Sequence, residues 1–244
     1  MTATAEAFGA LHRGRAPGDP LVLPGPWDAA SARVFEEAGF PALATPSAGV
    51  AASLGYADGA VPPREMFEAV ERIARSVSVP VSADVEDGYG LPARTLVGRL
   101  LDAGVVGCNL EDSRGREGAS SGTLKDPQEQ ADFLAAVRGV AGGELFVNAR
   151  VDTYVRGVAD LDETLRRARL YVEAGADCVY VIKAPVDAIP ALRDGIEGPL
   201  NVVFLPGGPS PKELGELGAT RVTFGPGLLF RAMEALRGVA EGLG

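Results

Sequence analysis

The sequence has few of the residues that carry much enzyme chemistry. Among its 244 residues there is one histidine, His12, and there are two cysteines, Cys108 and Cys178. A lone histidine ahead of the first predicted strand excludes a Ser-His-Asp triad unless it folds back, and we expect it to be exposed and not catalytic. Both cysteines lie inside apolar runs without metal-ligand spacing, so we expect two buried thiols in a reducing compartment.

The chain also lacks the marks of a membrane or secreted protein. No uncharged apolar run approaches the roughly 18 residues that a membrane span requires. The N-terminus has no basic region followed by an apolar one, so we expect a cytoplasmic protein with no membrane partner. The net charge of −10 argues against nucleic acid as a partner. It still permits an anionic small molecule, because a pocket can be locally positive.

What the sequence does contain is a regular alternation of apolar β-type runs and helical stretches. The runs are mostly continuous, as expected of parallel strands covered on both faces. Asp28 is a predicted helix N-cap, and Gly104 and Gly175 are predicted helix stops. Strands are predicted at 21–25, 42–47, 81–86, 107–112, 145–152, 178–183, 200–206 and 221–226, with helices at 29–38, 63–77, 92–103, 127–140, 161–174, 186–193, 211–217 and 228–240.

Eight alternating units in a chain of this length predict a (β/α)8 TIM barrel formed by one domain, residues 1–244. A doubly wound open sheet is the alternative. In a barrel, the active site lies at the C-terminal ends of the strands. The sequence therefore directs attention to the residues at which each predicted strand stops.

Three consecutive predicted strands end in charged residues. Asp84 and Glu86 close one, Glu111 closes the next and Arg150 lies near the end of the third. Asp84 and Glu86 are two residues apart, so their side chains point the same way. Carboxylates from separate strand ends suit a hard cation such as Mg²⁺, or Mn²⁺ in its place, and an arginine suits an anionic oxygen substrate. The combination predicts metal-assisted chemistry on a small carboxylate.

Two further segments flank these strand ends. Small residues at 45–49 would let backbone N–H groups approach an anion, or would simply form a turn. The polar, glycine-containing segment 111–125 is typical of a lid over a barrel mouth, although an ordinary surface loop has the same composition.

At these motifs the chain resembles the isocitrate lyase / phosphoenolpyruvate mutase superfamily, from Pro26 to Pro226. The most specific segments are SLGYAD at 53–58, DVEDGYG at 84–90, NLED at 109–112 and NARVD at 148–152. The resemblance implies a (β/α)8 barrel, Mg²⁺ and a 2-oxo acid or its enolate as the bound small molecule. It also implies a homo-oligomer, a dimer or a tetramer, because family members exchange a C-terminal helix.

The resemblance implies a role for individual residues. Asp84 corresponds to the principal metal carboxylate, and Glu86 and Glu111 to supporting carboxylates that act largely through water. Arg150 corresponds to the substrate-binding arginine. The remaining positions are Asp58 as an acid near the metal, Ser47 and Ala48 in a loop whose amides hold the substrate carboxylate, and Asn201 as a polar residue of the seventh strand.

The departures from the family pattern bear on the reaction. The lid at 114–125 has no cysteine or histidine, which argues against isocitrate and methylisocitrate lyase activity. It has no asparagine, and the sixth strand ends in Lys183 rather than histidine, which argues against mutase or phosphonopyruvate hydrolase activity. We expect a lyase that cleaves a C–C bond beside a 2-oxo carboxylate, oxaloacetate-type decarboxylation being the simplest version.

Three questions stay open at the level of sequence. Lys183 could supply a proton or contact a distal carboxylate, or it could be an ordinary surface residue. The chain could bind a 2-oxo acid without turnover, as a sensor or scavenger. P–C bond chemistry on a phosphonopyruvate-type substrate is a third possibility.

Overall fold

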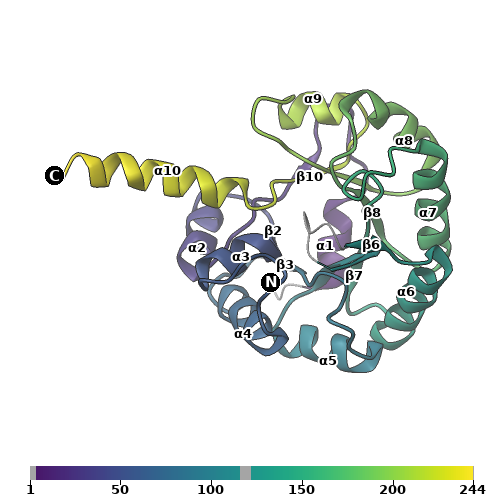
Figure 1. Ribbon diagram of the computed structural model, residues 1–244, viewed down its shortest axis with the longest axis horizontal. Coiled ribbons are helices and arrows are strands. Elements are labelled where there is room, and N and C mark those ends of the chain that lie inside the picture. The colour runs from purple at the N-terminus through teal and green to yellow at the C-terminus, as the bar shows by residue number, and fades with distance from the viewer. Residues whose placement is uncertain (1–3, 116–121, 244) are drawn as a thin grey trace.

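Eight parallel strands form the centre of the molecule (Figure 1). The computed structural model describes residues 4–115 and 122–243. The strands lie in the order β1-β10-β9-β8-β7-β4-β3-β2, and the N–H of Ala44 donates to the carbonyl of Pro24 at 3.1 Å across the gap between β1 and β2. The predicted (β/α)8 barrel is therefore confirmed. The strands are β1 (Leu21–Val22), β2 (Leu43–Thr45), β3 (Val81–Asp84), β4 (Gly107–Glu111), β7 (Phe146–Val151), β8 (Cys178–Val181), β9 (Leu200–Val203) and β10 (Arg221–Thr223).

Helices form an outer ring around the strands (Figure 1). Their inward faces are apolar; in α4, Met66, Val70 and Ile73 are completely buried against the sheet. The helices that follow the strands are α2 (Ala29–Glu37), α4 (Pro63–Ala74), α5 (Ala93–Asp102), α6 (Pro127–Ala141), α7 (Leu161–Glu173), α8 (Ile189–Gly195), α9 (Pro211–Glu216) and α10 (Gly227–Glu241). The last of these, α10, extends away from the ring instead of covering the barrel.

The predicted helix boundaries have the expected local causes. The Asp28 carboxylate accepts from the N–H of Ser31 at 2.7 Å and caps α2. Gly104 and Gly175 follow α5 and α7 with φ of 77° and 95°, a conformation that glycine adopts without steric cost. The segment predicted as one helix at 186–193 begins instead with a 3₁₀ turn, Val186–Ala188, before α8.

Three additions to the predicted set are two helices and one hairpin of two short strands. Helix α3 (Ser47–Ser53) follows β2 where a loop or turn was expected. Strands β5 (Ser113–Arg114) and β6 (Thr123–Leu124) pair as a small antiparallel hairpin within the predicted lid; residues 116–121 of that segment lie outside the described residues. The third is α1 (Ala5–Leu11), which is seen through the ring in Figure 1.

Helix α1 packs against the base of the barrel through an aromatic group. Phe8 is completely buried, and its ring lies 5.2 Å from that of Phe146 on β7. His12 stacks on Phe146 with 4.3 Å between the ring centroids. The expectation that His12 is exposed is therefore wrong, because only 3% of the residue is exposed. Burial, followed by the nearby charge of Arg221, lowers the pKa of His12 to about 3.

The remaining expectations about composition concern thiols and membranes. Cys108 and Cys178 are both free and buried, as predicted. In the described ranges, every helix is too short or too polar to cross a lipid bilayer.

Candidate active site

A pocket opens at the C-terminal ends of the strands, with about 450 Å³ of empty space including its open mouth. The position is the one at which TIM barrels carry their active sites. Side chains from β2, β3, β4, β7, β8 and β10 meet here. The lining residues are Ala44, Thr45, Pro46, Ser47, Ala48, Asp84, Asn109, Arg150, Tyr180, Ile182, Thr223, Gly225 and Pro226.

Asp84, the last residue of β3, is held at the pocket wall by three donors. Its Oδ2 accepts from the Ser47 hydroxyl at 3.0 Å and from the Ser47 N–H at 3.4 Å, and its Oδ1 accepts from the Glu86 N–H at 3.2 Å. Burial raises the pKa of Asp84, while the Arg150 charge opposes that rise. Ser47 and Ala48 do line the pocket, but in the first turn of α3 and not in a loop.

Glu86 is strained and incompletely satisfied. Its φ is +52°, in the left-handed region that costs a non-glycine residue energy and is enriched at functional sites. Its Oε1 is buried without a hydrogen-bond partner among the described residues. Burial, then the charges of Asp84 and the partly exposed Asp58, raise the pKa of Glu86 to about 7. The charge of Arg150 opposes this rise in the pKa of Glu86.

Arg150, on β7, lies between two carboxylates. Its Nη1 is 2.8 Å from Glu111 on β4, and its Nε and Nη2 donate to the two oxygens of Asp152 at 2.6 and 3.1 Å. All three side chains are buried. Burial raises the pKa of Glu111 well above its usual range, with the arginine charge acting in the opposite direction. This bidentate support fixes the direction of the guanidinium.

Asp152 was not among the predicted site residues. The signal that could have identified it is its spacing: two residues from Arg150 at the end of the same strand, it lies on the same face. Ser113 donates its hydroxyl to the Oδ2 of Asp152, and Arg156 donates to the Ser113 hydroxyl at 3.1 Å. The support of Arg150 therefore extends to the β5–β6 hairpin.

A second buried carboxylate, Asp112, ties the ends of β4 and β7 together. Its Oδ1 accepts from the N–H of Asp152 at 2.8 Å. Its Oδ2 accepts from Arg167 at 3.0 Å and from the Tyr171 hydroxyl at 2.8 Å, both on α7. No local sequence signal joins Asp112 to residues so far along the chain, which is why the sequence did not identify this network.

Lys125 is a further buried cation beside the site that the sequence treated only as the end of the lid. Its Nζ donates to the Glu111 carbonyl at 3.2 Å and to Gln130 at 3.1 Å, and burial lowers its pKa.

Two of the residues predicted for the site lie outside the pocket. Lys183 follows β8 with φ of +54° and is exposed, and Asn201 is completely buried, accepting from Thr223 at 3.2 Å. Neither lines the pocket.

The carboxylates at the mouth do not form a finished metal cluster but fit a hydrated cation. Among the described residues, no three Asp, Glu, His or Cys side chains lie together as a complete ligand set. Asp84, Glu86 and Glu111 nevertheless share raised pKa values, and the buried Glu86 Oε1 has no partner. Oxygen donors with room for water are the ligand set that Mg²⁺ and Mn²⁺ accept.

Comparisons with known proteins place the chain in a family. The family model described as phosphoenolpyruvate phosphomutase matches residues 8–243. An uncharacterized protein of Mycobacterium tuberculosis (strain H37Rv) is 37% identical over 231 residues, covering 92% of this chain and 86% of the relative.

Solved structures agree over nearly the whole chain. A candidate phosphonomutase from Burkholderia cenocepacia J2315 superposes with a TM-score of 0.88 at 39% identity, covering 98% of this chain and 99% of that one. A 2,3-dimethylmalate lyase superposes with a TM-score of 0.86 at 30% identity, covering 100% and 85%. Sequence and structure together show that the chain belongs to the isocitrate lyase/phosphoenolpyruvate mutase superfamily.

Proposed function

We propose that this protein is a Mg²⁺-dependent lyase that cleaves a C–C bond beside the carboxylate of a small 2-oxo or 2-hydroxy acid. The observation that carries the proposal is the fixed Arg150 beside Asp84 in a pocket at the barrel mouth. The superfamily membership supports lyase chemistry, and the similarity to a 2,3-dimethylmalate lyase supports a C–C bond as the target.

Each side chain has a physical task in this proposal. Asp84, Glu86 and Glu111 would hold the cation, the last two partly through water. The chemistry that a cation held there would supply is polarisation of a substrate carbonyl and stabilisation of negative charge on its oxygen. Arg150 binds the anionic oxygens of the substrate, because Glu111 and Asp152 already fix its orientation. Ser47 and Ala48 in the first turn of α3 line the same pocket, and Ser47 fixes the Asp84 carboxylate through its hydroxyl and its N–H.

The character of the pocket favours a substrate with one compact anionic end. Arg150 is the only positively charged side chain among the described lining residues, and Ile182, Pro46 and Pro226 give the wall an apolar part. A phosphonate dianion requires several strong donors, so this wall supports C–C cleavage over P–C bond chemistry.

A product assay tests the proposal. The wild-type protein is incubated with Mg²⁺ and separately with oxaloacetate, 2-alkylmalates or phosphonopyruvate, and the 2-oxo acid or enolate-derived product is measured. We expect turnover of at least one C–C substrate, abolished by EDTA. Asp84→Asn should lower kcat/KM by about 10²–10³-fold, the loss typical of removing one electrostatic group.

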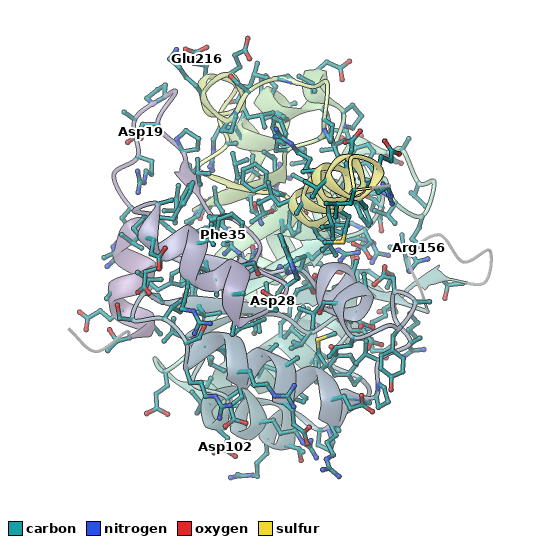
Figure 2. The ribbon with its side chains drawn as sticks, turned by 90° about the vertical axis from the view of Figure 1, so that its left-hand side faces the viewer. Asp19, Asp28, Phe35, Asp102, Arg156 and Glu216 are labelled. Carbon is teal, nitrogen blue, oxygen red and sulfur yellow. The ribbon has the colours of Figure 1, made fainter. Side chains whose placement is uncertain are left out.

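The matched control is Asp102→Asn, which alters an exposed carboxylate on the outer surface (Figure 2) and should leave the rate unchanged. Binding of a 2-oxo acid without any product would favour the sensor or scavenger function instead. Turnover of phosphonopyruvate alone would favour P–C bond cleavage.

We also propose that the protein is a homo-oligomer in which α10 packs on a second copy. The helix extends from the barrel (Figure 1), and its Phe230, Leu236 and Val239 side chains are 58%, 57% and 61% exposed. A helix with exposed large apolar side chains gains by burial against a partner. Light scattering after gel filtration should show a dimer or tetramer, and Leu236→Glu should reduce its size. A wild-type monomer at micromolar concentration would contradict the proposal.

A further inference from the structure

An arginine lies inside the barrel, underneath the pocket. Arg221 is on β10 and is 0% exposed. Its Nη2 donates to the Asn109 Oδ1 over a long 3.4 Å, whereas its Nε and Nη1 have no hydrogen-bond partner in the described part of the chain. Within residues 4–115 and 122–243, no carboxylate lies within the 4.0 Å of an ion pair with this guanidinium. Arg221 is thus a buried cation without a direct counter-charge.

Such a charge needs a physical reason. An arginine stays protonated in proteins, and burying an unpaired charge is strongly unfavourable. The interior of a TM barrel is normally filled by branched apolar side chains. Here Arg221 contacts Asn109, which bonds Asn148, and pairs in register with Asn201, and all of these residues are buried. A local conflict of this kind is expected where function, rather than stability, determines the residues.

The groups of α1 that lie beneath Arg221 do not neutralise its charge. The Phe8 ring of α1 lies 5.9 Å from the guanidinium carbon. His12 beside it is neutral, because burial and the Arg221 charge lower its pKa to about 3. Apolar groups and an uncharged imidazole therefore surround Arg221 on this side, and they screen its positive charge only weakly.

One side chain, that of Asn109, connects Arg221 with the pocket above it. Asn109 lines the pocket, and its Oδ1 accepts from Arg221 and from the Asn148 amide at 2.7 Å. Asn109 is also the strand partner of Asp84. The mouth carries Asp84, Glu86, Glu111 and Asp152 against Arg150 and the buried Lys125, so an entering anion faces more carboxylates than cations.

We propose that Arg221 is an additional positive charge for the anionic ligand, acting from beneath the pocket floor at Asn109 without contact with the ligand. The inference rests on the proposed function only in taking the ligand to be a small carboxylate. Arg221 is a positioning residue in this account: its charge offsets the carboxylates of the mouth so that both a cation and an anion can bind there.

The test exploits the fact that one charge acts on a cation and an anion with opposite sign. Titration calorimetry measures binding of Mg²⁺ alone, and of oxalate in the presence of Mg²⁺, to the full-length protein. Oxalate is a planar dianion that resembles the enolate of a 2-oxo acid. Arg221→Met and Arg221→Gln remove the charge, Arg221→Lys keeps it, and Arg94→Met removes an exposed charge as the control.

We expect the two neutral variants to bind oxalate on the order of tenfold more weakly, the effect of one buried charge at an intermediate dielectric. Mg²⁺ should bind as tightly or more tightly. Arg221→Lys should bind oxalate within about threefold of the wild type, a rescue expected of retained charge. The Gln variant, which keeps a donor toward Asn109, carries the test if the Met variant does not fold.

Two results would overturn the inference. One is unchanged oxalate affinity in a folded neutral variant. The other is a parallel loss of Mg²⁺ and oxalate affinity, the signature of a packing role. Failure of the proposed function is distinguishable, because the wild type would then bind neither Mg²⁺ nor oxalate.

Discussion

Replacing Glu86 by glutamine should make the metal-free protein more stable. The carboxylate is partly buried beside Asp84 and Asp58, and its buried Oε1 has no partner in the described chain. Glutamine has the same shape and removes the repelled charge. The backbone strain at φ of +52° remains in both proteins, so the comparison isolates the charge.

The magnitude follows from the pKa of Glu86, which burial and the neighbouring carboxylates raise from 4.5 to about 7. At about 1.4 kcal/mol per pKa unit, the upper bound is about 3 kcal/mol. Solvent reaches part of the side chain, so the expected gain is about 1–2 kcal/mol. For a chain of this size that corresponds to a rise in Tm of roughly 2–8 °C.

The direction of the pKa shift of Glu86 determines the pH range in which Glu86→Gln is more stable than the wild type. Between pH 4.5 and about 7 the folded protein binds more protons at Glu86 than the unfolded chain, so the wild type loses stability as the pH rises. Unfolding measured in EDTA should therefore separate the Glu86→Gln and wild-type proteins at pH 8 and bring them together near pH 4.5. Glu144→Gln, at an exposed site, should show no such separation. Equal or lower stability of Glu86→Gln at pH 8 would refute the reasoning.

Three other results are expected. The affinity for Mg²⁺ should rise about tenfold per pH unit up to about pH 7, since Glu86 must lose its proton to bind the cation; a flat profile in calorimetry at pH 6, 7 and 8 would contradict this. Asp152→Asn, which removes the carboxylate that accepts from Arg150 at 2.6 and 3.1 Å, should lower the free energy of unfolding in urea by about 3 kcal/mol and weaken oxalate binding. His12→Phe should resist acid better, because a histidine whose pKa is lowered to about 3 destabilises the fold as the pH falls below 6.5; identical thermal unfolding of the two proteins at pH 5 would disprove this.

The barrel was predictable because each βα unit carries its own local signals. Continuous apolar runs recur in every unit, and several units also have a cap such as Asp28 or a stop such as Gly104. Helices α1 and α3 were not predicted, although Thr4 caps α1 and Gly55 follows α3. Both are short and rich in alanine, and α3 follows a proline; they are stabilised by contacts such as those of Phe8 and Val50 with the core. Whether these two helices form depends on tertiary packing, which the sequence pattern does not show.

The candidate site was also predictable only in part. The charges at the ends of β3, β4 and β7 are local features, and the structure brings Asp84, Glu111 and Arg150 together around one pocket or its rim. The support from Arg167 and Tyr171 comes from a distant helix, so no spacing in the sequence reveals it. Lys183 lies at a strand end as expected, yet its left-handed backbone accompanies an exposed side chain.

The position of α1 has a consequence for how the molecule folds. Its Phe8 and His12 pack on Phe146, which lies on a strand formed from the second half of the sequence. A helix of this length is not stable alone in water, and α1 lacks one of its packing partners, the Phe146 ring, while the first four βα units are being synthesised. Helix α1 therefore completes its packing only after β7 has been made. Such distant contacts slow folding, and we expect the base of the barrel to close in a late step.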